Sequence, residues 1–234
     1  MRIAIFTISL GKYDIFFDEL YTSVNTKFLP NHEKHFFVFT DKEFTQKENL
    51  TQIRQEKLGW PYDTMMRFHF MNKIKDQLSK YDYIFFFNIN MKVLEPIGDE
   101  ILPGKENDCL MGCEHPLHYN WLPFNLPYER NKLSTCFIDK SENGKYYQGC
   151  FNGGKSKEFL EMSEILEKNI DIDVKNNVIP IWHDESMLNW YYQKKKPLTM
   201  DYSYIYPESL NLPLKRIMIQ RDKWKYMNKE ELRK

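Results

Sequence analysis

Three short stretches of the sequence carry side chains that could bind or transform a polar ligand. The first is residues 181–186, Ile-Trp-His-Asp-Glu-Ser. If Asp184 caps the helix predicted after it, Glu185 lies in the first turn, where a carboxylate stays ionised and can act as a base, a nucleophile or a cation stabiliser. An acidic pair that only stabilises a helix N-terminus fits the same residues. His183 beside Asp184 and Glu185 does not predict a metal site, because consecutive residues of one turn point in different directions.

The second stretch is a strand that ends in two amides. Residues 83–87, Tyr-Ile-Phe-Phe-Phe, predict a buried strand, and Asn88, Ile89 and Asn90 follow it. Side chains two residues apart lie on one side of a strand end, at the carboxyl edge where open sheets bind ligands. A pair of Asn residues that closes a turn is the alternative.

The third stretch, residues 146–154, places small residues between aromatic ones. Gln148 and Gly149 lie in its middle, where a small residue lets a ligand approach the backbone. Gly153 and Gly154 at its end fit equally well a turn into the next helix.

The elements that must position these stretches alternate between strand and helix. Short apolar runs predict strands at 3–8, 36–40 and 83–87 that are covered on both faces. A helical stripe falls within 13–27, and a second helix, capped by Asp63 or Thr64, is predicted from apolar residues that recur every four positions, at 66, 70, 74 and 78. This β-α-β-α-β pattern predicts an α/β fold that opens like a doubly wound, Rossmann-like nucleotide-binding sheet.

The rest of the chain is less regular. Residues 103–135 are rich in Pro, Asn, His and Trp and predict a loop over a site. Further helices are expected at 155–168 and 185–193. From Lys215 onward the chain is basic with few core-type residues, which predicts a mobile tail. We therefore expect a single domain over 1–214, followed by a basic tail at 215–234.

Composition excludes several classes of protein. The 33 Lys and Arg balance the 33 Asp and Glu, so the field that draws proteins to nucleic acid is missing. No apolar run approaches the roughly 20 residues of a membrane span. The cysteines at 109, 113, 136 and 150 fit neither a zinc ribbon nor a disulfide framework, and free thiols in a reducing cytosol are the better interpretation.

In this order, the motifs resemble glycosyltransferase family 6, the family of the blood-group A and B transferases and the mammalian α1,3-galactosyltransferases. The resemblance runs over most of the chain. It rests on Phe6-Thr7-Ile8 with Gly11-Lys12-Tyr13 after an apparent insertion of Ser9 and Leu10, Thr64-Met65-Met66-Arg67, Tyr128-Glu129-Arg130, Tyr146-Tyr147 with Gly153-Gly154, and residues 182–186 with Leu188-Asn189.

The resemblance implies a GT-A fold, with a donor-binding part at about 1–95 and an acceptor-binding part at about 96–214. It implies retaining transfer of galactose or N-acetylgalactosamine from a UDP-sugar to the 3-hydroxyl of a galactoside. Carried over, the UDP-binding residues would be Phe6, Thr7, Ile8, Tyr13, Thr64, Arg67, Asn88, Ile89, Asn90 and Lys223. The sugar-binding residues would be His115, Trp121, Gln148, Gly149, Trp182, His183 and Asp184. Glu185 would lie beneath the anomeric carbon, either as a nucleophile or as a charge that stabilises an oxocarbenium-like transition state.

One departure from the family is chemically important. Where the vertebrate members have Asp-x-Asp for a divalent cation, usually manganese, this chain has Asn88 and Asn90. Neutral amides give a hard cation no charge, so we expect no catalytic metal. The charge on the departing UDP must then be met by the protein, and the basic tail is the available source. Lys223 aligns best with the family's phosphate-binding lysine, with Lys225 and Arg233 near it, and the tail is expected to fold over UDP. A solvated tail with no role is the alternative.

The predictions of the donor sugar and of the acceptor rest on fewer residues. His115-Pro116 resembles the His-Pro of the blood-group enzymes and favours a Fucα1-2Gal acceptor. Room at Gly149 and the amide of Gln148 favour N-acetylgalactosamine as the donor sugar, although Cys150 replaces the Gly or Ala usual there. A transferase specific for UDP-galactose is the alternative donor.

Two further hypotheses concern the class of protein. A degenerate transferase that only binds glycans would explain the lost carboxylates, but Glu185 and Arg67 are intact. An unrelated nucleotide-binding protein would require the ordered motifs to be a coincidence. The start of the chain shows no leader or membrane anchor, and its basic residues are mostly Lys, which together predict a bacterial, cytoplasmic enzyme.

Overall fold

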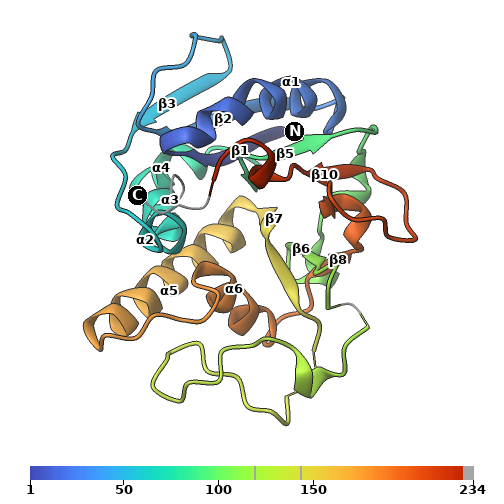
Figure 1. The fold of residues 1–234 in the computed structure, drawn as a ribbon. Coiled ribbons are helices and arrows are strands. Elements are labelled where there is room, and N and C mark those ends of the chain that lie inside the picture. Colours follow the sequence, from blue (N-terminus) through green and yellow to red (C-terminus); the bar gives the residue numbers. More distant parts are fainter. Residues whose placement is uncertain (119, 143, 229–234) are drawn as a thin grey trace.

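A seven-stranded sheet runs through the middle of the molecule in the order β3-β2-β1-β4-β7-β6-β8 (Figure 1). The computed structural model describes residues 1–118, 120–142 and 144–228. The strands are β1 (Arg2–Ser9), β2 (Glu33–Thr40), β3 (Leu50–Arg54), β4 (Tyr83–Asn88), β6 (Leu110–Glu114), β7 (Tyr147–Lys155) and β8 (Leu198–Met200). The first four in the sheet order are parallel, and β7 runs antiparallel to both of its neighbours.

A small second sheet ties the C-terminal part of the chain to the end of β4. It consists of β5 (Met91–Val93), β9 (Tyr206–Pro207) and β10 (Met218–Gln220), with β10 in the middle. Since only two residues separate β4 from β5, the pairing of β10 with β5 holds β10 next to the carboxyl edge of the main sheet.

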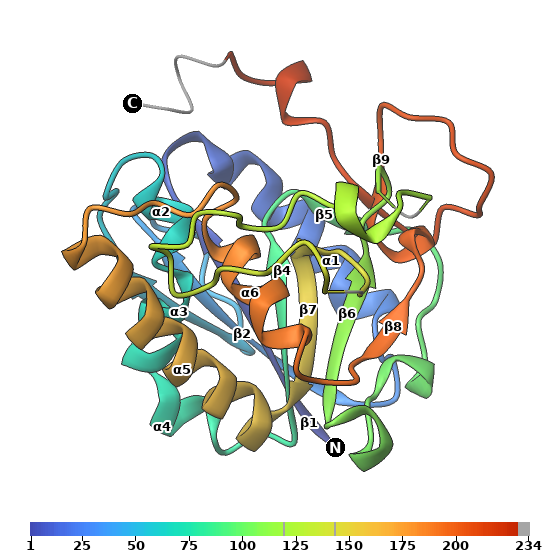
Figure 2. The same cartoon turned by 90° about the horizontal axis from the view of Figure 1, so that it is seen from below.

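Helices cover both faces of the main sheet (Figures 1 and 2). They are α1 (Phe17–Lys27), α2 (Tyr62–Met65), α3 (Arg67–Lys73), α4 (Lys75–Leu78), α5 (Ser156–Lys175) and α6 (Asp184–Tyr192). Alternation along β1 explains the two layers: Ile3 and Ile5 pack in the core that contains α1, whereas Ala4 and Phe6 pack in the core that contains α3, α5 and α6. Both faces of the central strands are buried, which accounts for their nearly continuous apolar sequence.

Several predicted elements are confirmed. The strands expected at 3–8, 36–40 and 83–87 are β1, β2 and β4, and they pair in parallel. The helix expected within 13–27 is present as a 3₁₀ turn at Gly11–Phe16 that continues into α1. The helices expected at 155–168 and 185–193 are α5, which continues to Lys175, and α6.

The helix predicted to start at Asp63 or Thr64 is wrong as a single element. It is three short helices, α2 to α4, because the backbone at Met66 (φ −83°, ψ 13°) and Ile74 (φ −120°, ψ 21°) leaves the helical region. Asp63 does not cap α2; its Oδ1 accepts a hydrogen bond from the backbone N–H of Leu58 at 2.6 Å.

The glycine pair Gly153-Gly154 is part of β7 and not a turn. A Cβ at Gly153 would lie 2.3 Å from the Phe85 ring, and one at Gly154 would lie 2.5 Å from the carbonyl oxygen of Cys109. Close packing between neighbouring strands therefore requires both glycines. The region 103–135 also contains β6, which the loop prediction missed. The described residues between 115 and 146 form turns, a short 3₁₀ helix at Pro123–Asn125 and irregular backbone.

The C-terminal segment has more apolar anchors than the sequence analysis expected. Met218 and Met227 are buried in the core that contains α1, and β10 pairs with two strands. The prediction of a mobile tail with few core-type residues is therefore wrong for residues 218–227, which are anchored by these two side chains and by β10. Arg233 lies outside the described residues. Whether the segment closes over UDP stays a prediction.

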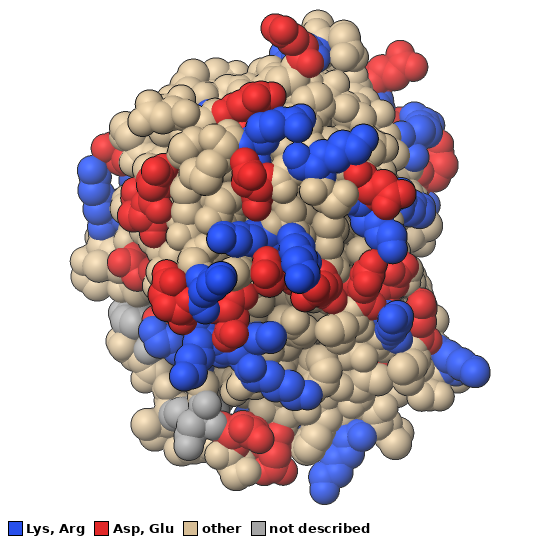
Figure 3. Space-filling view, turned by 180° about the vertical axis from the view of Figure 1, so that it is seen from behind, with Lys and Arg blue, Asp and Glu red and all other residues tan. Residues whose placement is uncertain are grey.

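The surface mixes both signs of charge. On the face in Figure 3, acidic and basic side chains are interspersed and no large basic patch forms. Within the described ranges, no helix is long and apolar enough to cross a membrane.

Candidate active site

A cavity of about 310 Å³ opens at the carboxyl ends of β1 and β4 and is flanked by the C-terminal segment. This is the edge of a parallel sheet where ligands bind in α/β folds. Nine of the predicted site residues line it: Ile8, Tyr13, Thr64, Arg67, Asn88, Ile89, Asn90, Asp184 and Lys223. Residues far apart in the sequence therefore meet at one place.

Phe6 and Thr7 do not reach this cavity. Both residues are fully buried within β1, and the hydroxyl of Thr7 donates a hydrogen bond to the carbonyl oxygen of Phe87 at 2.8 Å. From β1 and the residue after it, Ile8 and Leu10 line the cavity. The side chains of Phe6 and Thr7 are thus not part of the cavity lining, and a contact of these two residues with a nucleotide stays a prediction.

Lysine side chains give the cavity its positive charge. Lys12, Lys57 and Lys223 line it, and Nζ of Lys223 lies 3.2 Å from the hydroxyl of Tyr13. Such a set of ammonium groups can bind a phosphate-bearing ligand. The sequence analysis found Lys223 by resemblance but missed Lys12 and Lys57, although Lys12 lies within a quoted motif.

A buried ion pair forms one wall. Arg67 is 1% exposed, and its Nε lies 3.1 Å from Oδ2 of Asp184. Arg67 also donates to the carbonyl oxygen of Gly149 at 2.7 Å, and its guanidinium lies over the ring of Phe86. Burial raises the pKa of Asp184, while Arg67 opposes this. Nη2 of Arg67 is buried and has no hydrogen-bond partner among the described residues, so a ligand oxygen in the cavity can satisfy it.

Glu185 is held by two hydrogen bonds. Oε1 accepts one from the hydroxyl of Tyr146 at 2.8 Å, and Oε2 accepts one from the backbone N–H of Gly149 at 2.7 Å. Burial raises the pKa of Glu185 to about 7, against the two hydrogen bonds, which favour the ionised form. Burial thus acts against the ionised form that is expected for a carboxylate in the first turn of a helix.

The helix cap also differs from the prediction. His183, not Asp184, is the residue before α6, and it has φ 55° and ψ −121°. Asp184 is the first helical residue and Glu185 lies in the first turn, as expected. Positive φ is costly for a residue with a side chain, and such strain concentrates at functional sites. The ring of His183 contacts the ring of Trp60, which lines the cavity, and the two ring centroids are 5.2 Å apart.

Gly149 allows β7 to approach the two carboxylates. A Cβ at this position would lie 3.2 Å from Cβ of Glu185 and 3.6 Å from Oδ2 of Asp184. The neighbouring Gln148 donates from Nε2 to Oε1 of Gln220 at 3.1 Å, and Gln220 lines the cavity. Among the residues that the structure describes, Oε1 of Gln148 is buried and has no hydrogen-bond partner.

A cluster of rings lies next to Glu185. His115, His118 and Trp121 follow one another at intervals of three residues. The centroid of the His118 ring lies 4.2 Å from that of His115, on which it stacks, and 4.3 Å from that of Trp121. Both histidine rings also contact the ring of Tyr146. Burial and His118 lower the pKa of His115 to about 3, so this ring is neutral. Its Nδ1 accepts from the Leu117 N–H, which leaves Nε2 as the donor. His118 is not among the residues predicted from the sequence, although its regular spacing with His115 and Trp121 is visible there.

Motif residues outside the cavity hold its parts in place. Glu129 accepts from the backbone N–H of Asn131 at 2.7 Å and of Ile181 at 2.6 Å, which ties the irregular segment to the approach of α6. Asn189 binds the backbone N–H and carbonyl of Tyr147, each at 2.8 Å, and so joins α6 to β7. Trp182 is 47% exposed and lies outside the cavity lining, as do His115, Trp121, Gln148, Gly149, His183 and Glu185.

The residues at the end of β4 do not fit a divalent cation. Asn88 and Asn90 offer neutral amides, and Nδ2 of Asn90 donates to the carbonyl oxygen of Arg221 at 2.7 Å. In the part of the chain that the structure describes, no group of three or more His, Cys, Asp or Glu could hold a metal ion. Hard cations prefer several anionic oxygens, and the donor set here lacks them.

Comparison with known proteins decides the family. The sequence profile of glycosyltransferase family 6 matches residues 1–234, the whole chain. The chain belongs to glycosyltransferase family 6. Its mixed α/β architecture around the seven-stranded sheet is accordingly a GT-A-like glycosyltransferase fold.

Relatives of this family 6 member come from bacteria and vertebrates. The O-antigen biosynthesis glycosyltransferase WbnI of Escherichia coli is 39% identical over 226 residues, with 95% of each chain covered. The human globoside alpha-1,3-N-acetylgalactosaminyltransferase 1 is 27% identical over 84% of this chain and 58% of its own length. The rat histo-blood group ABO system transferase 1 is 25% identical over 89% of this chain and 62% of its own length. The chain thus spans about three fifths of these vertebrate relatives.

Proposed function

We propose that the protein is a retaining, metal-independent glycosyltransferase that moves N-acetylgalactosamine from UDP-GalNAc in α1,3 linkage to the galactose of a Fucα1-2Gal acceptor. The observation that carries this proposal is the arrangement at the cavity: three lysines, the Arg67–Asp184 pair, and Glu185 immediately behind Asp184. Transfer of a sugar from a nucleotide requires cations that bind the diphosphate and a carboxylate close to the anomeric carbon.

Each part of the donor has a matching group. The UDP moiety fits between Ile8, Tyr13 and the lysines, where Lys223 meets the negative charge that grows on the departing diphosphate. Arg67 and Asp184 orient the sugar hydroxyls. Glu185 supplies negative charge to the anomeric carbon, and both roles considered for it, nucleophile and stabiliser of an oxocarbenium-like transition state, need its ionised form.

The proposed independence from a metal ion is supported by the same residues. The donor set of Asn88 and Asn90 does not fit a divalent cation, so the lysines carry the task that a cation performs elsewhere. No step of the proposed reaction is assigned to a metal ion.

The choice of donor and acceptor sugars rests on two features. The unpartnered Oε1 of Gln148 can accept the N–H of an acetamido group, which galactose lacks. The neutral His115, with its Nε2 proton, and the rings of His118 and Trp121 form a surface suited to a sugar such as fucose.

The four free cysteines are buried, in keeping with a reducing cytoplasm.

Transfer assays with defined sugars test this proposal. The protein is incubated with UDP-GalNAc or UDP-Gal and with 2′-fucosyllactose or lactose, and the products are analysed by NMR. We expect an α-configured, 1,3-linked product from UDP-GalNAc and the fucosylated acceptor. Preference for UDP-Gal would replace the proposed donor with its alternative. Binding of fucosyllactose with no turnover from either donor would favour the degenerate, glycan-binding hypothesis.

A further inference from the structure

Asn90 and Arg221 join the end of β4 to the C-terminal segment. In the ladder between β5 and β10, Met91 lies opposite Gln220, so Asn90 and Arg221 form the next pair. The backbone N–H of Arg221 donates to the carbonyl oxygen of Asn90 at 2.8 Å, and Nδ2 of Asn90 donates back to the carbonyl oxygen of Arg221 at 2.7 Å. The reverse orientation of the amide would place two carbonyl oxygens against each other, so the donor role of Nδ2 is fixed.

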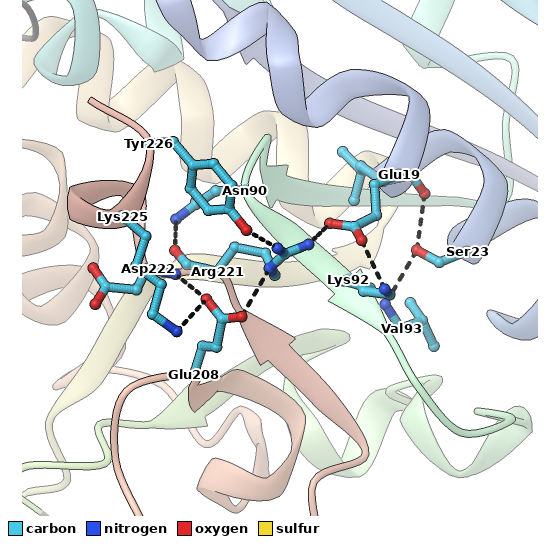
Figure 4. Close-up of polar contacts among 11 residues, drawn as sticks. Glu19, Ser23, Asn90, Lys92, Val93, Glu208, Arg221, Asp222, Lys225 and Tyr226 are labelled. Atoms are coloured by element: carbon cyan, nitrogen blue, oxygen red, sulfur yellow. Dashed lines mark hydrogen bonds and ion pairs between the residues drawn. The ribbon is translucent and has the colours of Figure 1, made fainter.

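The side chain of Arg221 continues this connection into the rest of the fold. Its guanidinium pairs with Glu19 of α1 and with Glu208, at 3.2 Å for the latter, and it also contacts the Tyr226 hydroxyl (Figure 4). Glu208 additionally accepts from the backbone N–H of Asp222 at 2.8 Å. The contacts of Arg221 with Glu19, Glu208 and Tyr226 thus fix the path of the chain after Arg221.

Two cavity residues come directly after this fixed point. Lys223 and Trp224 line the cavity and lie in the short turn Lys223–Lys225. Lys225 pairs with Glu208 at 3.5 Å instead of lining the cavity. The position of Lys223 therefore depends on where Arg221 is held.

We propose that Asn90 is a positioning residue whose side-chain amide latches the C-terminal segment at Arg221 and so places Lys223 at the cavity. The Asn90–Arg221 latch denotes the pair of hydrogen bonds between these two residues. A carboxylate at position 90 has no proton to donate and would oppose the carbonyl oxygen of Arg221. The latch thus requires an amide at position 90, whatever the metal requirement of the reaction. Its effect on catalysis rests on the proposed function, but the latch itself does not.

Limited trypsin digestion of the ligand-free protein tests the latch directly. Arg221, Lys223 and Lys225 are cleavage sites within the segment, and mass spectrometry gives the rate at each. Asn90→Asp is expected to raise the rate of cleavage at these sites by about tenfold. This factor reflects the free energy of one lost hydrogen bond and of a carbonyl group left without a partner. Asn90→Ala, which adds no charge, should change the rate in the same direction. Asn88→Asp adds the same charge two residues away and should leave the rates within about twofold of the wild type.

A double-mutant cycle on UDP binding tests the link to Lys223. Calorimetry compares Lys223→Ala in the wild type and in Asn90→Asp. We expect the lysine substitution to weaken UDP binding clearly in the first background and little in the second, because the latch no longer places the lysine. Additive effects, or equal protease sensitivity of Asn90→Asp and the wild type, would overturn the proposal. A wild type that binds no UDP would refute the proposed function, while the digestion still judges the latch.

Discussion

Glu185 shows how its surroundings set the behaviour of one residue. Its pKa is raised to about 7 because burial outweighs the hydrogen bonds from Gly149 and Tyr146. The folded state therefore favours the protonated form relative to an unfolded value near 4.5. The stability that this provides is present below pH 4.5 and is lost as the pH rises through 7. The ionised form, which both proposed roles of Glu185 need, is therefore reached at the expense of stability, a common trade-off at active sites.

The pH dependence of kcat/KM follows from this pKa. Activity should rise with pH with a midpoint near 7, since the ionised Glu185 is the active form. Tyr146→Phe removes a hydrogen bond to the carboxylate, so the midpoint should move to higher pH. Tyr83→Phe, which removes a distant hydroxyl that donates to the Pro103 carbonyl, is the control. A wild-type profile that is flat between pH 6 and 8, or an unchanged midpoint in Tyr146→Phe, would contradict this account.

At the level of elements, the active site is built where α6 meets β7. Asn189 is almost fully buried and binds both backbone groups of Tyr147 as well as the carbonyl oxygen of Glu185. It thereby sets the distance between Gly149 on the strand and Glu185 on the helix. The sequence analysis quoted Asn189 only as part of a motif, because a side chain that bridges two elements cannot be identified from spacing along one of them.

Asn189→Asp should lower the free energy of unfolding by about 1–3 kcal/mol, because it replaces the donor to Tyr147 and Glu185 with a carboxylate oxygen. Chemical denaturation with urea measures the change. Asn31→Asp, in an exposed turn, is the matched control and should change stability by less than about 0.5 kcal/mol. Equal stability of the two variants would show that the contact between α6 and β7 does not depend on this amide.

The elements that were predicted correctly share strong local signals. β1, β2 and β4 are apolar runs, and α1 and α5 have clear apolar stripes. β7 was missed because glycines in a sequence are typical of turns. In the fold, the glycines of β7 instead allow the close approach of Phe85 and Cys109. The break of the predicted helix into α2, α3 and α4 likewise depends on tertiary packing and not on local propensity.

For the molecule as a whole, the site joins parts of the chain that lie far apart in sequence. The carboxyl edge of the sheet, with Asn88 and Asn90 at the end of a buried strand, could be predicted from the strand pattern, whereas Arg67 and Asp184 were expected at the same site only from the resemblance to the family. The placement of the C-terminal segment could not, because its basic composition hides the two anchors Met218 and Met227. The ladder of β10 with β5 is a long-range pairing that leaves no local signal in the sequence.

The most direct test of the central claim is UDP release from UDP-GalNAc in the presence of 2′-fucosyllactose and EDTA, for the wild type and Glu185→Gln. Gln is isosteric: its oxygen can accept from the Gly149 N–H and its NH2 group can donate to the Tyr146 hydroxyl, so the fold should persist. We expect full wild-type turnover in EDTA and a fall of about a hundredfold or more in the variant. A wild-type rate that collapses in EDTA and returns with manganese, or a variant as fast as the wild type, would contradict the account.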